Sequence, residues 1–287
     1  MTQHPDVRGF FDPATHTVTY LVSDPATGMA AIIDPVLDFD PASARTSTRS
    51  IDAVMAALSE AGLTLALVLE THAHADHLTA ADHLREAEGV PIGIGVRITE
   101  VQAAFAPLFG AVDVTPDGRA FDRLYEDGAQ FRIGTMTVEV MHTPGHTAAC
   151  VSYRIGDAVF TGDTLFMPDY GTARTDFPGG DARTLYRSIQ RLLALPEDTR
   201  VFVGHDYLPE GRTDIRFETT VGAQRHGNVH VGGGVTEAAY VKMREARDAT
   251  LGAPRLILPS LQTNIRAGAL PPPEGGQRYL RLPVNVL

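Results

Sequence analysis

Four side chains that can bind a metal ion lie within the heptapeptide Thr71–His77, and they are His72, His74, Asp76 and His77. Neither a helix nor a strand would direct all four toward one side, so the segment is expected to form a loop that holds a metal. The apolar, branched run at 65–69 just before it predicts a buried strand. Loops at strand ends are where α/β architectures place their chemistry.

Three later segments carry further histidine or carboxylate side chains, each after a run typical of a strand. They are His142–Thr147 with His146, Phe160–Thr164 with Asp163, and Val203–Tyr207 with His205. The ordered series is far more specific than any single His-x-His pair, so it predicts one metal cluster. Imidazole and carboxylate ligands suit Zn, Fe or Mn, and the absence of thiolates argues against a closed zinc site or an iron–sulfur cluster.

The remaining histidines and the single cysteine carry no such motif. Cys150 lies in an apolar strand, which favours a packed thiol over a nucleophile. The histidines expected to be ordinary surface or core residues are His4, His16, His83, His142, His226 and His230.

The elements that must position the cluster follow from hydrophobic periodicity. Strand-like runs recur at 17–22, 29–33, 65–69, 135–141, 149–155, 158–161 and 201–203, and helices are expected at 51–61, 78–88, 185–193 and 236–249. Tight turns at Gly134 and Gly156-Asp157 indicate antiparallel or mixed sheets. We therefore expect an α+β fold in which two mixed sheets lie between helices. A catalytic domain is expected at 1–210, with a helical and loop appendage at 211–287 packed on it.

Composition limits the classes of function. The 287 residues carry 24 basic and 35 acidic side chains, a net charge of -11 that opposes binding to nucleic acid or to an anionic membrane. No segment approaches the roughly 20 apolar residues that span a bilayer, so a soluble, cytoplasmic protein is expected. The single cysteine excludes an internal disulfide.

The ordered series His72-x-His74-x-Asp76-His77, His146, Asp163 and His205 resembles the signature of the metallo-β-lactamase superfamily. By motif spacing the resemblance covers roughly residues 10–210. It implies a four-layer αβ/βα sandwich with the metal site at one edge, between the two sheets, in agreement with the architecture expected above.

Within the superfamily the chain resembles persulfide dioxygenases. An insertion at Pro168–Ala173 is typical of the bacterial β-lactamase-hydrolase-like branch, and Gln262–Gly268 resembles the family's closing segment with its asparagine. The segments that carry the resemblance to persulfide dioxygenases are Thr71–Thr79, Pro144–Thr147, Ala173–Phe177 and Gly204–Tyr207.

That resemblance implies one Fe(II) per chain, bound by His72, His146 and Asp163. Two histidines and a carboxylate leave three positions for a persulfide sulfur and O₂, and the products would be sulfite and the thiol. The substrate would be glutathione persulfide or another low-molecular-weight persulfide, in sulfide detoxification. The residues that would support or orient the ligands are His74, Asp76, His77 and His205.

The ligand series leaves two alternatives open. A dinuclear zinc hydrolase of the glyoxalase II type, acting on acylglutathione thioesters, would use all seven ligands, with Asp163 bridging. A metal-dependent sensor or binding module could also keep the fold. We favour the dioxygenase because of the Arg174–Phe177 element.

Basic and aromatic residues provide candidates for substrate contact. Arg174 either holds a glutathione carboxylate or, as we favour slightly, pairs with Asp176. Tyr207 either donates a hydrogen bond into the open metal positions or packs beneath the site. Arg212 and Arg225 are further candidates for binding glutathione. The carrier of the persulfide and the oligomeric state, for which a homodimer is one option, stay open.

Overall fold

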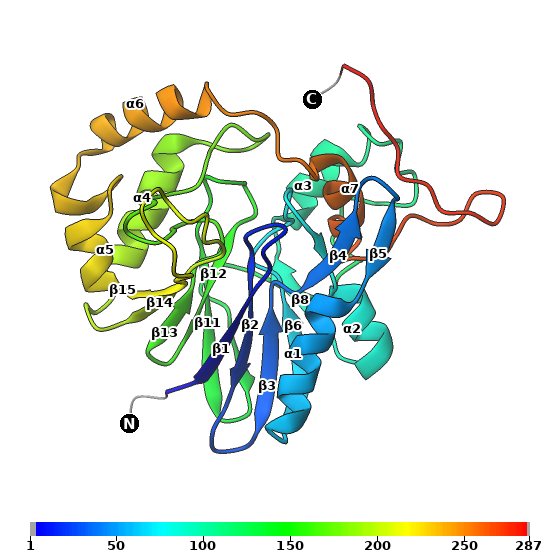
Figure 1. Cartoon of the computed structure of the whole chain (residues 1–287), viewed down its shortest axis with the longest axis horizontal. Coiled ribbons are helices and arrows are strands. Elements are labelled where there is room, and N and C mark those ends of the chain that lie inside the picture. The colour runs from blue at the N-terminus through cyan, green and yellow to red at the C-terminus, as the bar shows by residue number, and fades with distance from the viewer. Residues whose placement is uncertain (1–3, 286–287) are drawn as a thin grey trace.

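The computed structural model describes residues 4–285, in which two six-stranded sheets face each other (Figure 1). The first sheet has the order β1 (Asp6–Phe11), β2 (Val18–Ser23), β3 (Met29–Ile33), β6 (Thr64–Leu69), β8 (Ile92–Gly95) and β9 (Arg123–Tyr125). The second has the order β10 (Gln130–Ile133), β11 (Met136–His142), β12 (Val151–Ile155), β13 (Ala158–Phe160), β14 (Arg200–Phe202) and β15 (Glu218–Thr220). Each sheet contains parallel and antiparallel pairs, which confirms the prediction of mixed sheets.

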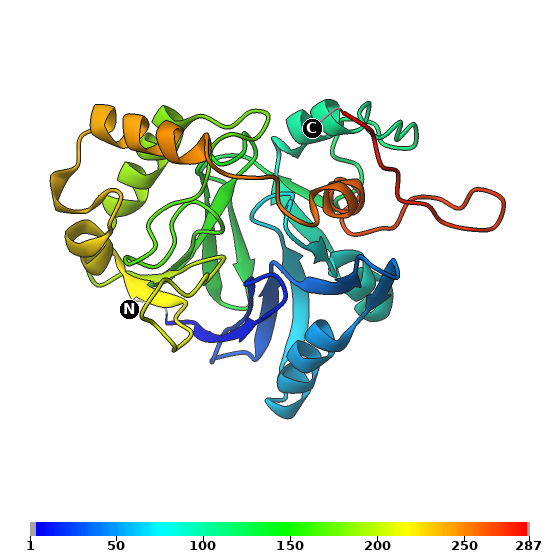
Figure 2. The ribbon, with the colours of Figure 1, turned by 45° about the horizontal axis from the view of Figure 1, so that its top comes forward.

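Helices cover the outer faces of the sheets, and this produces four layers (Figures 1 and 2). On the first half these are α1 (Arg49–Glu60), α2 (Ala81–Glu88), α3 (Ile98–Phe105) and α7 (Ile257–Asn264). On the second half they are α4 (Ala182–Leu193), α5 (Val221–Gly227) and α6 (Glu237–Asp248), with a short 3₁₀ turn at Gly232–Gly234. Among residues 4–285, no helix combines the length and apolar character needed to cross a bilayer.

Strand β2 shows why the sandwich forms. All six of its residues are buried, because successive side chains point to opposite faces and both faces are covered. Val18, Tyr20 and Val22 pack between the two sheets, whereas Leu21 packs in the core beneath the helices of the first half. Fully burying one such apolar side chain stabilises the fold by about 1.5–3 kcal/mol.

The expected helix from Leu78 was wrong at its beginning, because Leu78–Thr79 forms the short strand β7. Together with β4 (Val36–Asp40) and β5 (Arg45–Ser47), β7 builds a three-stranded sheet in the order β5-β4-β7. The Thr79 hydroxyl then accepts a hydrogen bond from the Ala81 amide, and α2 begins at Ala81. Pairing with a distant strand therefore outweighs local helix propensity at these two positions.

Residues after 210 contribute to both halves of the molecule. β15 extends the second sheet by pairing antiparallel with β14, and α5 and α6 pack on α4. A connecting segment then crosses to α7, which lies against β7 (Figure 2). The proposed boundary at 210 thus lies between elements that share one sheet.

Candidate metal centre

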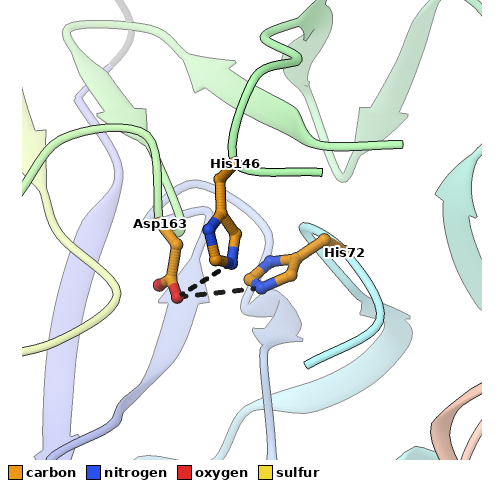
Figure 3. Close-up of side chains that lie close together, drawn as sticks. All are labelled: His72, His146 and Asp163. Atoms are coloured by element: carbon orange, nitrogen blue, oxygen red, sulfur yellow. Dashed lines mark ion pairs between the residues drawn. The ribbon is translucent and has the colours of Figure 1, made fainter. Parts of the chain in front are cut away.

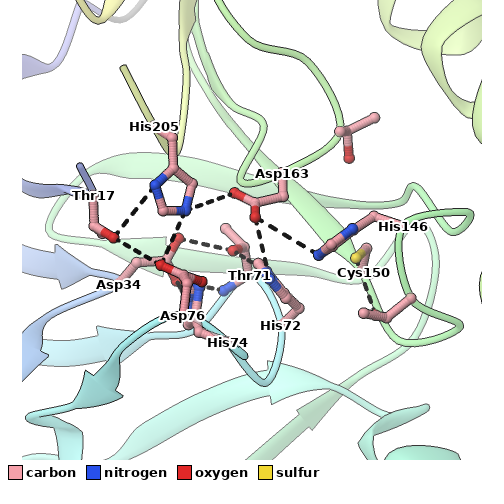
Figure 4. A network of polar contacts seen from close by, with 12 residues as sticks. Thr17, Asp34, Thr71, His72, His74, Asp76, His146, Cys150, Asp163 and His205 are labelled. Carbon is pink, nitrogen blue, oxygen red and sulfur yellow. Dashed lines mark hydrogen bonds and ion pairs between the residues drawn. The ribbon is translucent and has the colours of Figure 1, made fainter. Parts of the chain in front are cut away.

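The seven candidate ligands meet where strands from both sheets end. Figure 4 shows six of them, namely His72, His74, Asp76, His146, Asp163 and His205. The loop with His72, His74, Asp76 and His77 follows β6, and the loops with His146, Asp163 and His205 come after β11, β13 and β14. An isolated β-bridge between Thr17 and His205 joins the first and second halves beside the cluster. The structure thus brings together every side chain that the motifs selected.

Two of the turns in these loops require glycine. Gly145 has φ +131°, and a Cβ atom there would lie 2.3 Å from the backbone of Leu185 in α4. Gly162 has φ +48°, and a Cβ atom there would lie 2.5 Å from the Thr71 hydroxyl oxygen. The backbone at both sites therefore approaches its neighbours too closely for a side chain, and the turns aim His146 and Asp163 inward.

The donor atoms of His72, His146 and Asp163 lie within 4.8 Å of one another (Figure 3). The Nε2 atoms of the two histidines are 3.8 and 3.7 Å from Asp163 Oδ2. All three side chains are buried, and neither His72 Nε2 nor Asp163 Oδ1 has a hydrogen-bond partner in the described part of the chain. Unpaired buried polar atoms are costly unless an ion satisfies them, so this set fits a metal.

Neighbouring groups hold both histidines with Nε2 free. His72 Nδ1 donates to the Thr71 hydroxyl at 3.0 Å, and that hydroxyl donates to Asp34 Oδ2 at 2.8 Å. His146 Nδ1 donates to the carbonyl of Arg174 at 2.8 Å. Burial, reinforced by the nearby His74 and His146, holds the pKa of His72 well below its usual range, so its imidazole is neutral and able to bind metal.

A second group of donors shares Asp163 with the first. His205 Nε2 lies 3.4 Å from both Asp76 Oδ2 and Asp163 Oδ1. His77 Nδ1 is 3.0 Å from Asp76 Oδ2, and the Thr17 hydroxyl is 3.2 Å from each of these two atoms. Asp163 thus occupies the place that a bridging carboxylate would take between two ions.

His74 faces two acidic residues that no sequence motif revealed. Its Nε2 atom lies 3.1 Å from Asp34 Oδ1 and 3.4 Å from Glu70 Oε2. Burial opposes charge on this imidazole, but the two carboxyl groups outweigh burial and raise the pKa of His74 well above its usual value. Burial raises the pKa of Glu70 to about 7. Asp34 directly follows β3 at a positive φ of 51°, and only its place at a strand end could have suggested it.

The closing asparagine is the side chain that ties α7 to the metal loop. Asn264 Nδ2 donates to the carbonyls of His74 and His77 at 2.8 Å each, and its oxygen accepts from the Thr79 amide at 2.9 Å. All of these groups are buried, so one side chain satisfies three backbone groups of the loop. The sequence indicated this segment only through its resemblance to the family.

A second contact from the C-terminal region holds the segment that positions His146. Asp248 accepts hydrogen bonds from the amide and the hydroxyl of Thr175, both at 2.9 Å. The fully buried Arg244 pairs with Asp248 at 2.7 Å and donates to the carbonyl of Thr172 at 3.1 Å. The carbonyl of Arg174, which accepts the hydrogen bond from His146 Nδ1, belongs to a residue between Thr172 and Thr175.

A cavity of about 320 Å³ opens beside the donors, and His146, Asp163 and Asp76 line it. Tyr207 also lines it and stacks on His205, with ring centroids 5.0 Å apart. His16, which was expected to be an ordinary surface or core residue, contributes to the same wall. Arg174 lines the cavity as well, while its guanidinium pairs with both oxygens of Asp176 at 2.6 Å, as the favoured prediction had it.

The expected substrate contacts by Arg225 and Arg212 do not agree with their positions. Arg225 donates to the carbonyls of Leu193 and Leu195, and neither arginine is among the described residues that line the cavity. Arg212 pairs with Asp206. The role of an arginine depends on the tertiary partners it finds, which the sequence does not show.

Cys150 is buried and inert. Burial raises the pKa of its thiol to about 12, so the thiolate needed for nucleophilic attack is absent near neutral pH. This agrees with a packed thiol.

The sequence profile of the metallo-β-lactamase superfamily matches residues 12–205, which include all seven candidate ligands. The chain belongs to the metallo-β-lactamase superfamily. The crystal structure of ETHE1 from Myxococcus xanthus is similar with a TM-score of 0.74 and 32% identity, over 92% of this chain and 100% of that one. The predicted sandwich of this superfamily is therefore confirmed.

Relatives within the superfamily carry two kinds of name. A probable metallo-hydrolase of Burkholderia pseudomallei is 50% identical, covering 98% of this chain and 99% of the relative. The β-lactamase hydrolase-like protein of Xylella fastidiosa is also 50% identical over 99% of this chain, which spans 66% of that relative's length. Human mitochondrial persulfide dioxygenase ETHE1 is 34% identical over 70% of this chain and 68% of its own. The resemblance to persulfide dioxygenases and to the hydrolase-like branch is confirmed.

Proposed function

We propose that the protein is a persulfide dioxygenase, which uses one Fe(II) and O₂ to oxidise the terminal sulfur of glutathione persulfide or a similar small persulfide. The observation that supports this most directly is the convergence of His72, His146 and Asp163 beside an open cavity. Two histidines and one carboxylate are the ligands of non-haem Fe(II) oxygenases, in which they leave coordination positions open. Similarity to persulfide dioxygenase ETHE1 adds support.

The reaction balances with dioxygen as the oxidant. RSSH, O₂ and H₂O give RSH, sulfite and two protons: the S–S bond breaks, the persulfide loses four electrons in total, and dioxygen accepts them. Iron would supply the electron exchange that brings dioxygen and sulfur together. The Thr71 hydroxyl and the Arg174 carbonyl accept hydrogen bonds from Nδ1 of His72 and His146, and this directs both Nε2 atoms toward the centre.

Tyr207 lines the cavity, and its hydroxyl is a candidate donor of a hydrogen bond to a bound substrate. Burial raises the pKa of its phenol well above the usual value, and the carboxylates of Asp76 and Asp163 raise it further. The phenol therefore keeps its proton at neutral pH, and it can donate to a substrate sulfur or oxygen beside the metal.

Oxygen uptake by iron-loaded protein tests the proposal. Supplied with glutathione persulfide, the wild-type protein is expected to consume one O₂ for each sulfite formed. His72→Ala should abolish uptake and lower the bound iron, whereas His83→Ala, an exposed histidine of α2, should leave both unchanged. Iron-loaded wild-type protein that consumes no oxygen with any small persulfide would overturn the proposal.

A dinuclear zinc hydrolase of the glyoxalase II type is the second candidate. One observation favours it, namely that Asp163 belongs to two donor groups, one with His72 and His146 and one with Asp76 and His205. Two ions held there could activate a hydroxide against the carbonyl of an acylglutathione thioester. Rapid thioester hydrolysis by zinc-loaded protein, without oxygen uptake by the iron-loaded form, would favour this candidate.

A further inference from the structure

The segment between α6 and α7 forms part of the wall of the metal-site cavity. It crosses from one half of the molecule to the other, as Figure 2 shows. Arg247, at the end of α6, and Leu251, Pro254 and Arg255 in the connecting segment line the same cavity as His146 and Asp163. A molecule that reached the metal donors through this cavity would therefore pass beside two arginines.

Four arginines line the cavity, and they fall into two pairs. Arg174 is neutralised by Asp176, and the buried Arg244 is neutralised by Asp248. By contrast, the guanidinium groups of Arg247 and Arg255 are exposed, and within residues 4–285 neither makes a hydrogen bond or an ion pair. Each guanidinium offers five N–H donors in a planar fork that suits a carboxylate or phosphate.

The charged residues that line the cavity differ in their exposure to solvent. Asp163 is buried among the metal donors, whereas Arg247 and Arg255 are exposed residues of the cavity wall. Arg255 also lines a neighbouring pocket that contains Asp38 and Asp40. The guanidinium carbon of Arg247 lies 6.0 Å from the centre of the Tyr170 ring. This contact favours side-chain conformations that keep the guanidinium beside the ring. A ligand that fits this pattern carries sulfur at one end and an anionic group at the other.

We propose that Arg247 and Arg255 form a subsite for an oxyanion, carboxylate or phosphate, on the carrier part of the substrate. The proposed subsite rests on the proposed function in one respect, namely that the sulfur end of the substrate lies toward His72, His146 and Asp163. A cavity of about 320 Å³ is within the usual range for small-molecule sites, so a tripeptide-sized carrier can lie between the two ends. Because both arginines are exposed, salt should weaken the interaction.

Steady-state kinetics provide the first test. The double substitution Arg247→Gln and Arg255→Gln should raise KM for glutathione persulfide about 30-fold or more and leave kcat within about twofold, because binding is lost without disturbing the metal. KM for an uncharged alkyl persulfide should not change. Arg225→Gln, which removes an arginine outside the cavity, is the matched control and should behave as wild type. An equal rise in KM for the charged and uncharged persulfides would overturn the subsite.

Direct binding to the metal-loaded protein separates failure of the subsite from failure of the proposed function. Calorimetric titrations with glutathione, glutathione diethyl ester and coenzyme A need no turnover. If the double variant loses affinity for glutathione, and the wild-type protein binds the ester weakly, the group bound by the subsite is a carboxylate. If the double variant loses affinity for coenzyme A alone, the bound group is a phosphate. If the double variant binds both thiols as wild type does, the subsite is wrong, whether or not the protein consumes oxygen.

Discussion

At the scale of single residues, the hydroxyl of Thr71 links a metal donor to an acid outside the cluster. It accepts from His72 Nδ1 and donates to Asp34, so it fixes which nitrogen of His72 carries the proton. Partners of this kind that orient metal ligands are typically worth 10- to 100-fold in metal affinity.

We therefore predict that Thr71→Val weakens metal binding about 10- to 100-fold and lowers the free energy of unfolding by about 1–3 kcal/mol, because a buried N–H and a carboxylate oxygen lose their partner. Competition with a chelator and urea denaturation measure the two effects. Thr46→Val makes the same substitution at an exposed position and is the control, so it should leave both quantities unchanged. Wild-type metal affinity in Thr71→Val would show that the link is not needed.

Tyr207 gives a second prediction at this scale. Tyr207→Phe keeps the ring stacked on His205 and removes only the hydroxyl. We expect kcat of oxygen uptake to fall about tenfold, the equivalent of one hydrogen bond of about 1.4 kcal/mol, with KM changed less than twofold. An unchanged kcat would assign Tyr207 to packing alone.

At the scale of elements, α7 and the loop 171–175 show how distant segments hold the centre. Asn264→Asp keeps the acceptor for the Thr79 amide but replaces two donated hydrogen bonds by repulsion between a carboxylate and the carbonyls of His74 and His77. We predict a loss of about 3 kcal/mol in stability and weaker metal binding. Chemical denaturation and chelator competition check this, with the exposed Gln277→Glu as control. Stability equal to wild type would contradict it.

The second element-scale prediction concerns pH. His230 Nδ1 accepts from the Thr172 amide at 3.0 Å, and burial, helped by the charges of Arg244 and Arg247, lowers the pKa of His230 to about 4. The unfolded chain titrates near 6.5. Between these values only the unfolded state binds this proton, so the free energy of unfolding falls as the pH drops from about 6.5 to 4.

His230→Asn should flatten that part of the stability profile by about 1–2 kcal/mol, a figure reduced for the partial exposure of the ring. Urea denaturation between pH 4 and 7.5 measures the difference from wild type, so that titrations common to both proteins cancel. His83→Asn, at an exposed position of α2, is the control. Parallel profiles for wild type and His230→Asn would contradict the assignment.

At the scale of the whole molecule, the convergence of the candidate metal donors could be predicted from sequence because each follows a strand and belongs to a local motif. Asp34 and Glu70 could not, because a single acid has no spacing and its partner is set by how β3 and β6 pair. Arg247 and Arg255 rather than Arg225 line the cavity for the same reason. Leu78 pairs with Leu37, a contact that no local pattern reveals, so the start of α2 was misplaced.

The division of the chain into a catalytic domain at 1–210 and an appendage at 211–287 stays a proposal. Asn264 and Asp248 both lie beyond residue 210, and each holds a loop that carries metal donors. We therefore expect the catalytic domain to need the residues after 210 in order to bind metal tightly, although its ligands all precede them.

The central claim is that His72, His146 and Asp163 would hold one Fe(II), and that the protein uses O₂ to oxidise a persulfide there. The most direct measurement is elemental analysis of protein purified anaerobically without added metal, combined with oxygen uptake on the same sample. We predict about one iron per chain. We also predict that O₂ uptake requires glutathione persulfide and rises in proportion to the iron content. Two zinc ions per chain, no oxygen uptake and rapid hydrolysis of an acylglutathione thioester would contradict it.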